Sequence, residues 1–598
     1  MIFQSIKYKT LVGFICCFAF AKALKAQEDP DSNLGTEVVN VVKPYSPTIS
    51  DAFKVKATPQ LNDSITTAKK TVTYSIFSVP VASTFTPAKG KAAGIKKEPK
   101  AKYYDNYATL GGGNFTTALA ELYSNFKLSK TQDFSVFLKH NSSQGGIDDV
   151  LVDDDFYDTR LKLNYGAREK KMSWRVGLDG KHQSFNWYGI AQEIVDLQNL
   201  IDPSFITEDT DVAHSYITGG INGGVQFNDA FFEGATIDLR YFQDSENNNE
   251  LRAVVKPTVV FPIAGENITT GIEVDYLDGS FDNEFTGAIT ANDYSILNAG
   301  ISPNLEILHD DLSLNIGFAA FVSNESRTSV GSEEVSDTDI FVYPRVSASY
   351  RVVGDYFIGY AGVDGDLHQN NYHDFAQENP FIAPDQRVQT TDKQYDGYLG
   401  MKGKLSNSLS FNLRANYASE INKPLFVNND SSLFAEGAAA WLNGNSFTVA
   451  YDDVETFGVF GELNIDVNSK FKMKINGQFS SYTTDRELEA WNLPDITASI
   501  FGDYQITKQW FTGVNLFFVG ERQDLGFAGN STTPVLSREV IVLENYFDIN
   551  AHVGYRVNDR LSTFARVNNI LDNDYERWQN YQVQGLQGLI GATYKFDF

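Results

Sequence analysis

The final eleven residues of the chain, 588–598, alternate between apolar and polar side chains up to the last position. One face carries Ile590, Ala592, Tyr594, Phe596 and Phe598, and the other carries Thr593, Lys595 and Asp597. Because successive side chains of a β-strand point to opposite sides, this stretch is predicted to be a strand with one apolar face. Its backbone edge needs a neighbour, and in a closed barrel the first strand is that neighbour. The stretch therefore favours a closed β-barrel.

The same alternation recurs from Tyr103 onwards in runs of roughly 10 to 14 residues, a length suited to tilted membrane-spanning strands. In one run the apolar set is Leu409, Phe411, Leu413, Ala415 and Tyr417, and the polar set is Ser410, Asn412, Arg414 and Asn416. In another, Phe471, Met473, Ile475 and Phe479 oppose Lys472, Lys474, Asn476 and Gln478. The pattern predicts an all-β chain.

Short polar turns and longer polar loops separate these runs in alternation. Turns are predicted near 129–133, 168–171, 228–230, 264–266, 309–311, 354–355, 406–408, 468–470, 507–509 and 558–560. Longer loops are predicted at 145–155, 188–211, 324–337, 366–391, 420–446, 522–540 and 570–585. Together with a strand at each end, the turns imply a transmembrane antiparallel β-barrel of about 22 strands, with short periplasmic turns and long outer loops.

Composition agrees with this prediction. The 598 residues include 44 Phe and 30 Tyr but only 4 Met, which favours strands over helices. No uninterrupted apolar run reaches the roughly 18 residues of a membrane-spanning helix. A net charge of −27 argues against nucleic acid or an anionic surface as a partner. The alternative is a soluble β-propeller or string of β-sandwiches, whose regular repeat signatures the sequence lacks.

The first 26 residues have the features of a secretory signal peptide. Lys7 and Lys9 precede an apolar stretch, and small residues surround the expected cleavage after Ala23 or Ala26. A lipoprotein signal is the alternative, but Ile15 before Cys16 is too large for that cleavage. Both cysteines, Cys16 and Cys17, fall in this segment, so the mature chain is expected to be exported without a disulfide.

Residues 27–102 differ from the rest and are predicted to be a short, mostly irregular periplasmic segment. A β-prone patch at 36–42 is stopped by Pro44 and Pro47, since proline supplies no donor to a strand ladder. A Lys-, Gly- and Ala-containing stretch at 86–102 is predicted to be a flexible basic linker. The predicted organisation is therefore a signal peptide at 1–26, this segment at 27–102 and the barrel at 103–598.

The segments 566–575 (RVNNILDNDY) and 594–598 (YKFDF) resemble the end of a TonB-dependent outer-membrane receptor barrel. The resemblance implies import of a scarce ligand across the outer membrane of a Gram-negative bacterium, with energy transmitted by TonB to a short box near the N-terminus. The segment containing Thr36, Glu37, Val38, Val39 and Val41 resembles a degenerate form of that box. The ending Tyr594, Phe596 and Phe598 resembles the signal that the outer-membrane assembly machinery recognises.

The chain departs from this family because residues 27–102 provide only about half a plug, without its Gly-rich strand–loop pattern. A wide barrel without a plug would be an open pore, so something is expected to block it. The candidates are segment 27–102, long loops that fold inwards, or a partner protein. Expected partners are outer-membrane lipid, the assembly machinery, and TonB or other outer-membrane proteins.

No constellation in the sequence predicts an enzyme, and no cofactor is predicted. The acidic run 148–158 matches no calcium-loop pattern, and His368 with His373 is a weak metal signal. Aromatic residues at strand–loop borders are predicted to form the interfacial girdle: Phe185, Trp187, Tyr188, Trp441, Tyr575, Trp578 and Tyr581. Inward-facing cations predict a partly basic lumen: Arg160, Lys162, Arg175, Lys181, Arg414, Lys472 and Lys474.

The resulting functional prediction is uptake or passage of a solute across the outer membrane. The alternative is a plugless structural or assembly subunit of an outer-membrane protein complex.

Overall fold

The structure, a computed structural model, describes residues 102–148, 150–192, 194–195, 210–228, 231–263, 265–282, 291–329, 333–429, 440–468, 470–528 and 537–598. The chain divides into two units, Met1–Ala88 and Lys89–Phe598. All described residues belong to the second unit, so the predicted signal peptide and nearly all of segment 27–102 lie outside them. Among the described residues, no helix is long and apolar enough to cross a membrane.

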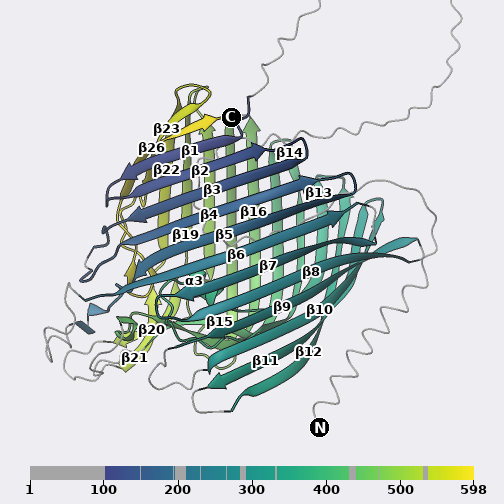
Figure 1. Ribbon diagram of the computed structural model, residues 1–598, viewed down its shortest axis with the longest axis horizontal. Coiled ribbons are helices and arrows are strands. Elements are labelled where there is room, and N and C mark those ends of the chain that lie inside the picture. Colours follow the sequence, from purple (N-terminus) through teal and green to yellow (C-terminus); the bar gives the residue numbers. More distant parts are fainter. Residues whose placement is uncertain are drawn as a thin grey trace, which may run out of the picture. The chain divides into compact units, whose positions relative to one another are not determined.

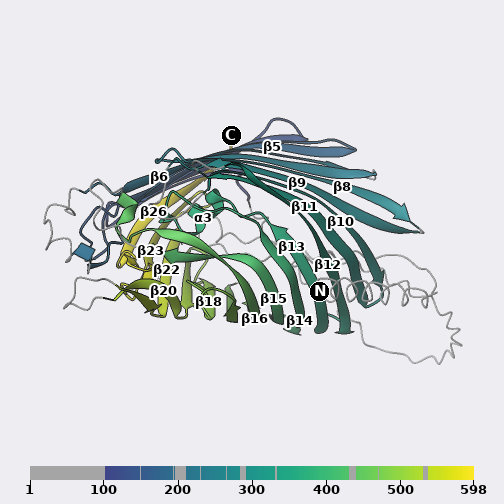
Figure 2. The same ribbon diagram turned by 90° about the horizontal axis from the view of Figure 1, so that it is seen from below.

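Twenty-two antiparallel strands form one sheet whose first and last strands pair with each other, so the sheet closes into a barrel (Figures 1 and 2). These strands are β1 (Asn106–Gly113), β2 (Ala118–Lys127), β3 (Gln132–Ser143), β4 (Phe156–Arg168), β5 (Met172–Asn186), β6 (Ala213–Phe227), β7 (Phe232–Asp244), β8 (Asn249–Ile263), β9 (Glu266–Ser280), β10 (Ala291–His309), β11 (Leu312–Ser329), β12 (Val335–Val353), β13 (Phe357–His368), β14 (Thr391–Ser406), β15 (Leu409–Asn428), β16 (Phe447–Asn468), β17 (Phe471–Thr484), β18 (Ile496–Gln505), β19 (Trp510–Val519), β22 (Tyr546–Arg556), β23 (Leu561–Asn568) and β26 (Gln587–Phe596). The predicted barrel and its strand count are confirmed.

The connections carry the remaining elements. Two small hairpins are formed by β20 (Arg522–Ala528) with β21 (Ser537–Leu543), and by β24 (Glu576–Trp578) with β25 (Tyr581–Gln582). The helix α3 (Tyr372–Glu378) lies between β13 and β14, and the 3₁₀ helix η2 (Ala440–Leu442) lies between β15 and β16. The C-terminus and the β20–β21 hairpin mark opposite ends of the barrel (Figure 1). The end with the hairpin is called the loop end below.

Each of the ten predicted turns joins two consecutive strands at the position expected. Barrel strands extend well into two of the predicted loops, because β11 continues to Ser329, β12 starts at Val335, and β15 continues to Asn428. The hairpins β20–β21 and β24–β25 occupy parts of two other predicted loops. Between β11 and β12 the paired ladder extends through polar residues, for example where Glu325 pairs with Asp337. A strand end that is polar on both faces carries no alternation, so sequence patterning assigns it to a loop.

The barrel closes where β1 pairs with β26, from Asn106 opposite Phe596 to Gly113 opposite Leu589. Thr109 Oγ1 and Thr593 Oγ1 lie 2.9 Å apart across this seam, in a buried position. Gly113 is required at the loop end of the seam, because a Cβ there would lie 2.3 Å from the carbonyl oxygen of Gly588. The last strand therefore finds its neighbour in the first, as its one-sided apolar pattern predicted.

The outer face of the barrel is apolar. Leu399, Leu413 and Val459 are exposed on neighbouring strands, whereas Arg414 and Lys474 face inwards to carboxylate partners. Aromatic residues gather on the outer face near the short turns, where Trp510 packs against Tyr555 with ring centres 4.8 Å apart. An apolar outer wall with aromatic residues at its edge is what a transmembrane barrel presents to lipid.

At six of the seven predicted positions, all except Arg175, the lumen wall is not basic. Cations and carboxylates alternate across neighbouring strands, with Arg160 paired to Asp179 at 3.1 Å and Arg414 paired to Asp396 at 3.0 Å. Other such pairs are Lys162–Asp179, Lys181–Asp158, Lys472–Asp466 and Lys474–Glu462. The prediction of a basic lumen is therefore wrong there, because sequence periodicity identifies an inward cation but not the carboxylate beside it on the next strand.

Candidate functional site

The connection from β13 to β14, residues 369–390, folds into the lumen and is called the inner loop below. A connecting segment usually runs over the surface, but here only Asp374, Glu378 and Arg387 are exposed. Figure 2 shows α3, which belongs to this loop, between the walls of the barrel. Of the candidates for blocking the lumen, an inward-folded long loop is thus present in the structure.

The inner loop begins with a capped helix. Asn371 has extended backbone angles, and its side chain accepts a hydrogen bond from the Asp374 backbone N–H at 2.9 Å, so it is the N-cap of α3. The Glu250 carboxylate of β8 accepts further bonds from the backbone N–H groups of Tyr372, at 2.6 Å, and His373, at 3.3 Å. A negative charge at a helix N-terminus is stabilising, so the barrel wall itself completes the cap.

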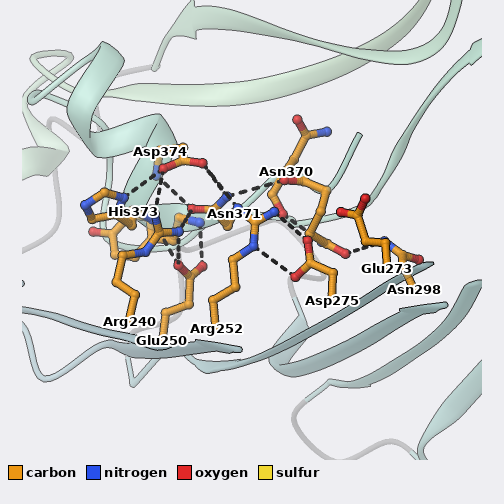
Figure 3. Close-up of polar contacts among 12 residues, drawn as sticks. Arg240, Glu250, Arg252, Glu273, Asp275, Asn298, Asn370, Asn371, His373 and Asp374 are labelled. Atoms are coloured by element: carbon orange, nitrogen blue, oxygen red, sulfur yellow. Dashed lines mark hydrogen bonds and ion pairs between the residues drawn. The ribbon is translucent and has the colours of Figure 1, made fainter. Parts of the chain in front are cut away.

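Two arginines of the wall hold the first turn of α3 from the side, as Figure 3 shows. Arg240 of β7 donates to Asp374 at 3.1 Å and to the Asn371 side chain at 2.8 Å. Arg252 of β8 lies 3.5 Å from Asp374 and makes a bidentate pair with Asp275 of β9, at 2.6 and 3.0 Å. The planar guanidinium groups thereby connect three barrel strands to one loop carboxylate.

The electrostatics of this cluster keep Asp374 charged. Desolvation by the surrounding lumen wall would by itself raise the pKa of Asp374, but the hydrogen bond from His373 and the charge of Arg240 outweigh it and hold that pKa well below its usual range. Burial and Arg240 together lower the pKa of His373, against the opposing effect of Asp374. At neutral pH the arginines therefore meet a carboxylate, and a neutral imidazole donates Nδ1–H to Asp374 at 2.8 Å.

The remainder of the inner loop attaches to other parts of the lumen. The Pro380 carbonyl accepts from Tyr216 of β6 at 3.0 Å. Gln386 binds the backbone of β16, donating to the Phe447 carbonyl at 3.1 Å and accepting from the Val449 N–H at 2.9 Å. Near its end the loop is held by Thr390, whose hydroxyl donates to Glu325 of β11 at 2.6 Å. The loop therefore bridges separate stretches of the wall.

The aromatic residues predicted to form the lipid girdle lie inside the loop end instead. Trp187 and Tyr581 are each 1% exposed, and Trp441 and Trp578 are also buried. They pack with the inner loop, where Phe381 stacks on the Tyr581 ring with centres 3.6 Å apart. The girdle prediction is wrong for these residues because a strand–loop border looks the same in sequence whether the loop turns outwards or folds back into the lumen.

A cavity of about 340 Å³ lies beside the inner loop. Its wall combines aromatic rings with carboxylates, side-chain amides and one guanidinium. These groups come from strands β5, β22 and β23, from the loops before β4, β6 and β26, and from the inner loop. The lining includes Asp155, Phe185, Tyr188, Phe381, Asp548, Tyr575 and Arg577. An aromatic wall with a few polar groups is typical of a small-molecule site.

The two sequence-predicted sites fall in different parts of the chain. The box-like segment Thr36, Glu37, Val38, Val39 and Val41 lies outside the described residues. Tyr594, Phe596 and Phe598 lie at or beyond the end of β26, at the closing seam, and their role in assembly stays a prediction. Within the described residues, no group of three or more His, Cys, Asp or Glu side chains is arranged to hold a metal ion.

Sequence reasoning missed Arg240, Glu250, Arg252 and Asp374, which together attach the inner loop to the wall. Arg240 and Arg252 follow the same alternation of inward and outward side chains as Arg160, so their inward position could have been predicted from the sequence. Their partner could not, since Asp374 lies more than a hundred positions further along the chain.

Solved structures share this fold. The ferripyoverdine receptor of the Pseudomonas aeruginosa outer membrane, solved with ferripyoverdine, is 13% identical, with a TM-score of 0.59 over 84% of this chain and 72% of that one. The ferric-catecholate import receptor Fiu of E. coli K12 is 13% identical, with a TM-score of 0.58 over 83% and 82%. The FrpB iron transporter of Neisseria meningitidis is 10% identical, with a TM-score of 0.62 over 83% and 82%.

No protein-family model matches the sequence, and no curated protein matches it. The similar structures are receptors and transporters of the outer membrane, not enzymes. This chain thus has a closed 22-stranded β-barrel fold similar to that of these receptors and transporters.

Proposed function

We propose that the protein takes up a solute across the outer membrane, binding it at the loop end and passing it through the lumen. The observation that carries this proposal is the inner loop: a 22-stranded barrel encloses a wide lumen, and here a buried, hydrogen-bonded segment bridges it. A barrel that served only as passive scaffold has no need of such an element. The shared fold with structures described as import receptors supports the same function.

Import through an occluded barrel needs energy, and TonB is the proposed source. The segment Thr36, Glu37, Val38, Val39 and Val41 is the proposed contact, by its resemblance to the TonB box. The apolar outer face is proposed to contact outer-membrane lipid. During insertion, the assembly machinery is proposed to recognise Tyr594, Phe596 and Phe598.

Affinity purification of the full-length protein from detergent-extracted membranes tests the proposal. Recovery of TonB with the wild-type chain, and its loss when residues 36–42 are deleted, is the expected result. Recovery of other outer-membrane proteins in fixed stoichiometry, without TonB, would instead support the structural or assembly role.

Conductance in planar bilayers tests the occlusion separately. Replacing residues 372–388 by a Gly-Ser linker is expected to increase single-channel conductance, because it removes α3 and the contacts of Pro380 and Gln386. Equal conductance of the two proteins would contradict an occluding role for the inner loop.

A further inference from the structure

The cavity beside the inner loop is lined by rings that are already held in place. Phe381 is fixed by its stack on Tyr581, and Tyr575 is fixed by a stack on Tyr546 with ring centres 3.9 Å apart. Tyr188 donates its hydroxyl to the Gln582 carbonyl at 2.8 Å. Because these aromatic side chains are ordered before a ligand arrives, binding costs little side-chain entropy.

The polar groups of the cavity are also oriented, yet keep bonding capacity. Asn550 donates to one carboxylate oxygen of Asp548 at 3.0 Å, while Oδ1 of Asp548 has no hydrogen-bond partner among the described residues. Asn186 donates to Oδ1 of Asp155 at 2.8 Å. The Arg577 guanidinium also lines the cavity.

The charge of the lining selects against anions. The ionisable carboxylates and cations of the wall are Asp154, Asp155 and Asp548 against Arg577 alone. A ligand with several negative charges would meet like charges at close range, which disfavours it. The wall instead suits a ligand that donates to carboxylates, accepts from one guanidinium and presents apolar C–H groups to ring faces.

We infer that this cavity binds an uncharged polyhydroxylated ligand, and the class that fits is a neutral oligosaccharide. The hydroxyl groups of a sugar donate to Asp155 and Asp548 and accept from Arg577, and its C–H faces pack on Tyr188, Phe381 and Tyr575. The inference rests on the proposed uptake function and specifies its solute.

Binding of neutral oligosaccharides to the full-length protein in detergent tests the inference. A glycan array identifies the best neutral glycan, and titration calorimetry with that glycan then compares the wild type with three variants. Asp548→Asn and Arg577→Gln are each expected to weaken binding about tenfold or more, because each removes a charge-assisted hydrogen bond. Asp153→Asn is the control. Asp153 is exposed in the acidic run 148–158, which also contains Asp155, but it does not line the cavity.

Several outcomes would overturn the inference. Failure of every neutral glycan to bind is one, and preferential binding of a neutral tripeptide is another. If an anionic ligand is the true solute, Arg577→Gln weakens its binding but Asp548→Asn strengthens it, the opposite of the paired loss expected here. Gel mobility before and after heating confirms that each variant is folded. Because binding is measured without TonB, loss of TonB-driven uptake would contradict the proposed function while leaving this result intact.

Discussion

The Glu250 carboxylate of β8 accepts the backbone N–H of Tyr372, the first residue of α3, across 122 positions of sequence. Glu250 is 1% exposed and also accepts from the Tyr294 hydroxyl at 2.8 Å. A buried charge of this kind is tolerated only because its hydrogen bonds are complete, and the helix it caps is too short to persist alone. The position of the inner loop thus depends on a residue in the barrel wall.

Glu250→Ala is expected to release the first turn of α3. The change leaves two backbone N–H groups and the Tyr294 hydroxyl without their acceptor and removes a carboxylate 3.9 Å from Arg240, at a local cost of about 3 kcal/mol or more. Hydrogen exchange of residues 372–378 should then be on the order of 100-fold faster. Glu266→Ala, at an exposed position after the β8–β9 turn, is the control and should leave this exchange unchanged.

Arginine substitutions on adjacent residues of β17 test which face meets lipid. Ile475→Arg places a charge on the apolar outer face and is expected to lower refolding stability in lipid vesicles by roughly 2–4 kcal/mol. Asn476→Arg places the same charge in the lumen, opposite Glu462 of β16, and should cost little. Equal losses for the two variants would contradict the assignment of the faces.

A pair of glycines at the seam tests barrel closure. Gly113→Ala places a Cβ 2.3 Å from the Gly588 carbonyl oxygen and is expected to reduce the folded, heat-modifiable fraction severalfold. At Gly588 a Cβ would meet nothing within 4 Å, so Gly588→Ala should fold like the wild type. Gel mobility after refolding, with and without heating, measures both. A normal folded fraction for Gly113→Ala would show that the seam tolerates a local shift.

The buried carboxyl group of Asp524 predicts that the stability of the β20–β21 hairpin depends on pH. Burial raises its pKa from the usual 3.8 to about 6, against hydrogen bonds from the Asn428 N–H and the Asn492 side chain. The folded hairpin therefore binds more protons than the opened one between pH 3.8 and about 6, so its stability falls as pH rises through this range and levels off above it. Exchange protection of 522–528, corrected for intrinsic rates, should decline from pH 4 to pH 7 in the wild type and not in Asp524→Asn.

Deletion of Phe598 tests the proposed assembly role of the last strand. The Phe598 ring is 84% exposed and stacks on Phe126 with centres 5.1 Å apart. If the assembly machinery recognises this ring, deleting Phe598 should lower the folded fraction of the protein made in cells. The same deletion should lower the folded fraction less when the purified protein is refolded from denaturant. Asp597→Asn, which keeps an acceptor for the Asp105 N–H, is the control. Equal losses in cells for both variants would argue against a special role of the terminal ring.

The sequence by itself determined the barrel. Alternation with a period of two has one physical cause, the opposed directions of successive strand side chains, and it predicted the inward position of Arg414 and the outward position of Leu413. The turns followed from local chemistry that needs no distant partner. Even the closing seam was implied, because a strand such as 588–598 requires a neighbour for its edge.

Only the tertiary structure decided what fills the lumen. Residues 369–390 are polar enough to be a solvated outer loop, and nothing local distinguishes that state from the buried one. The position of Asn371 and Asp374 beside Arg240 becomes favourable only when the barrel places arginine and carboxylate groups from three strands around them. The same holds for Trp187 and Tyr581, whose neighbours come from distant loops. Such contacts depend on how strands far apart in sequence are arranged around the barrel, and no periodicity records that arrangement.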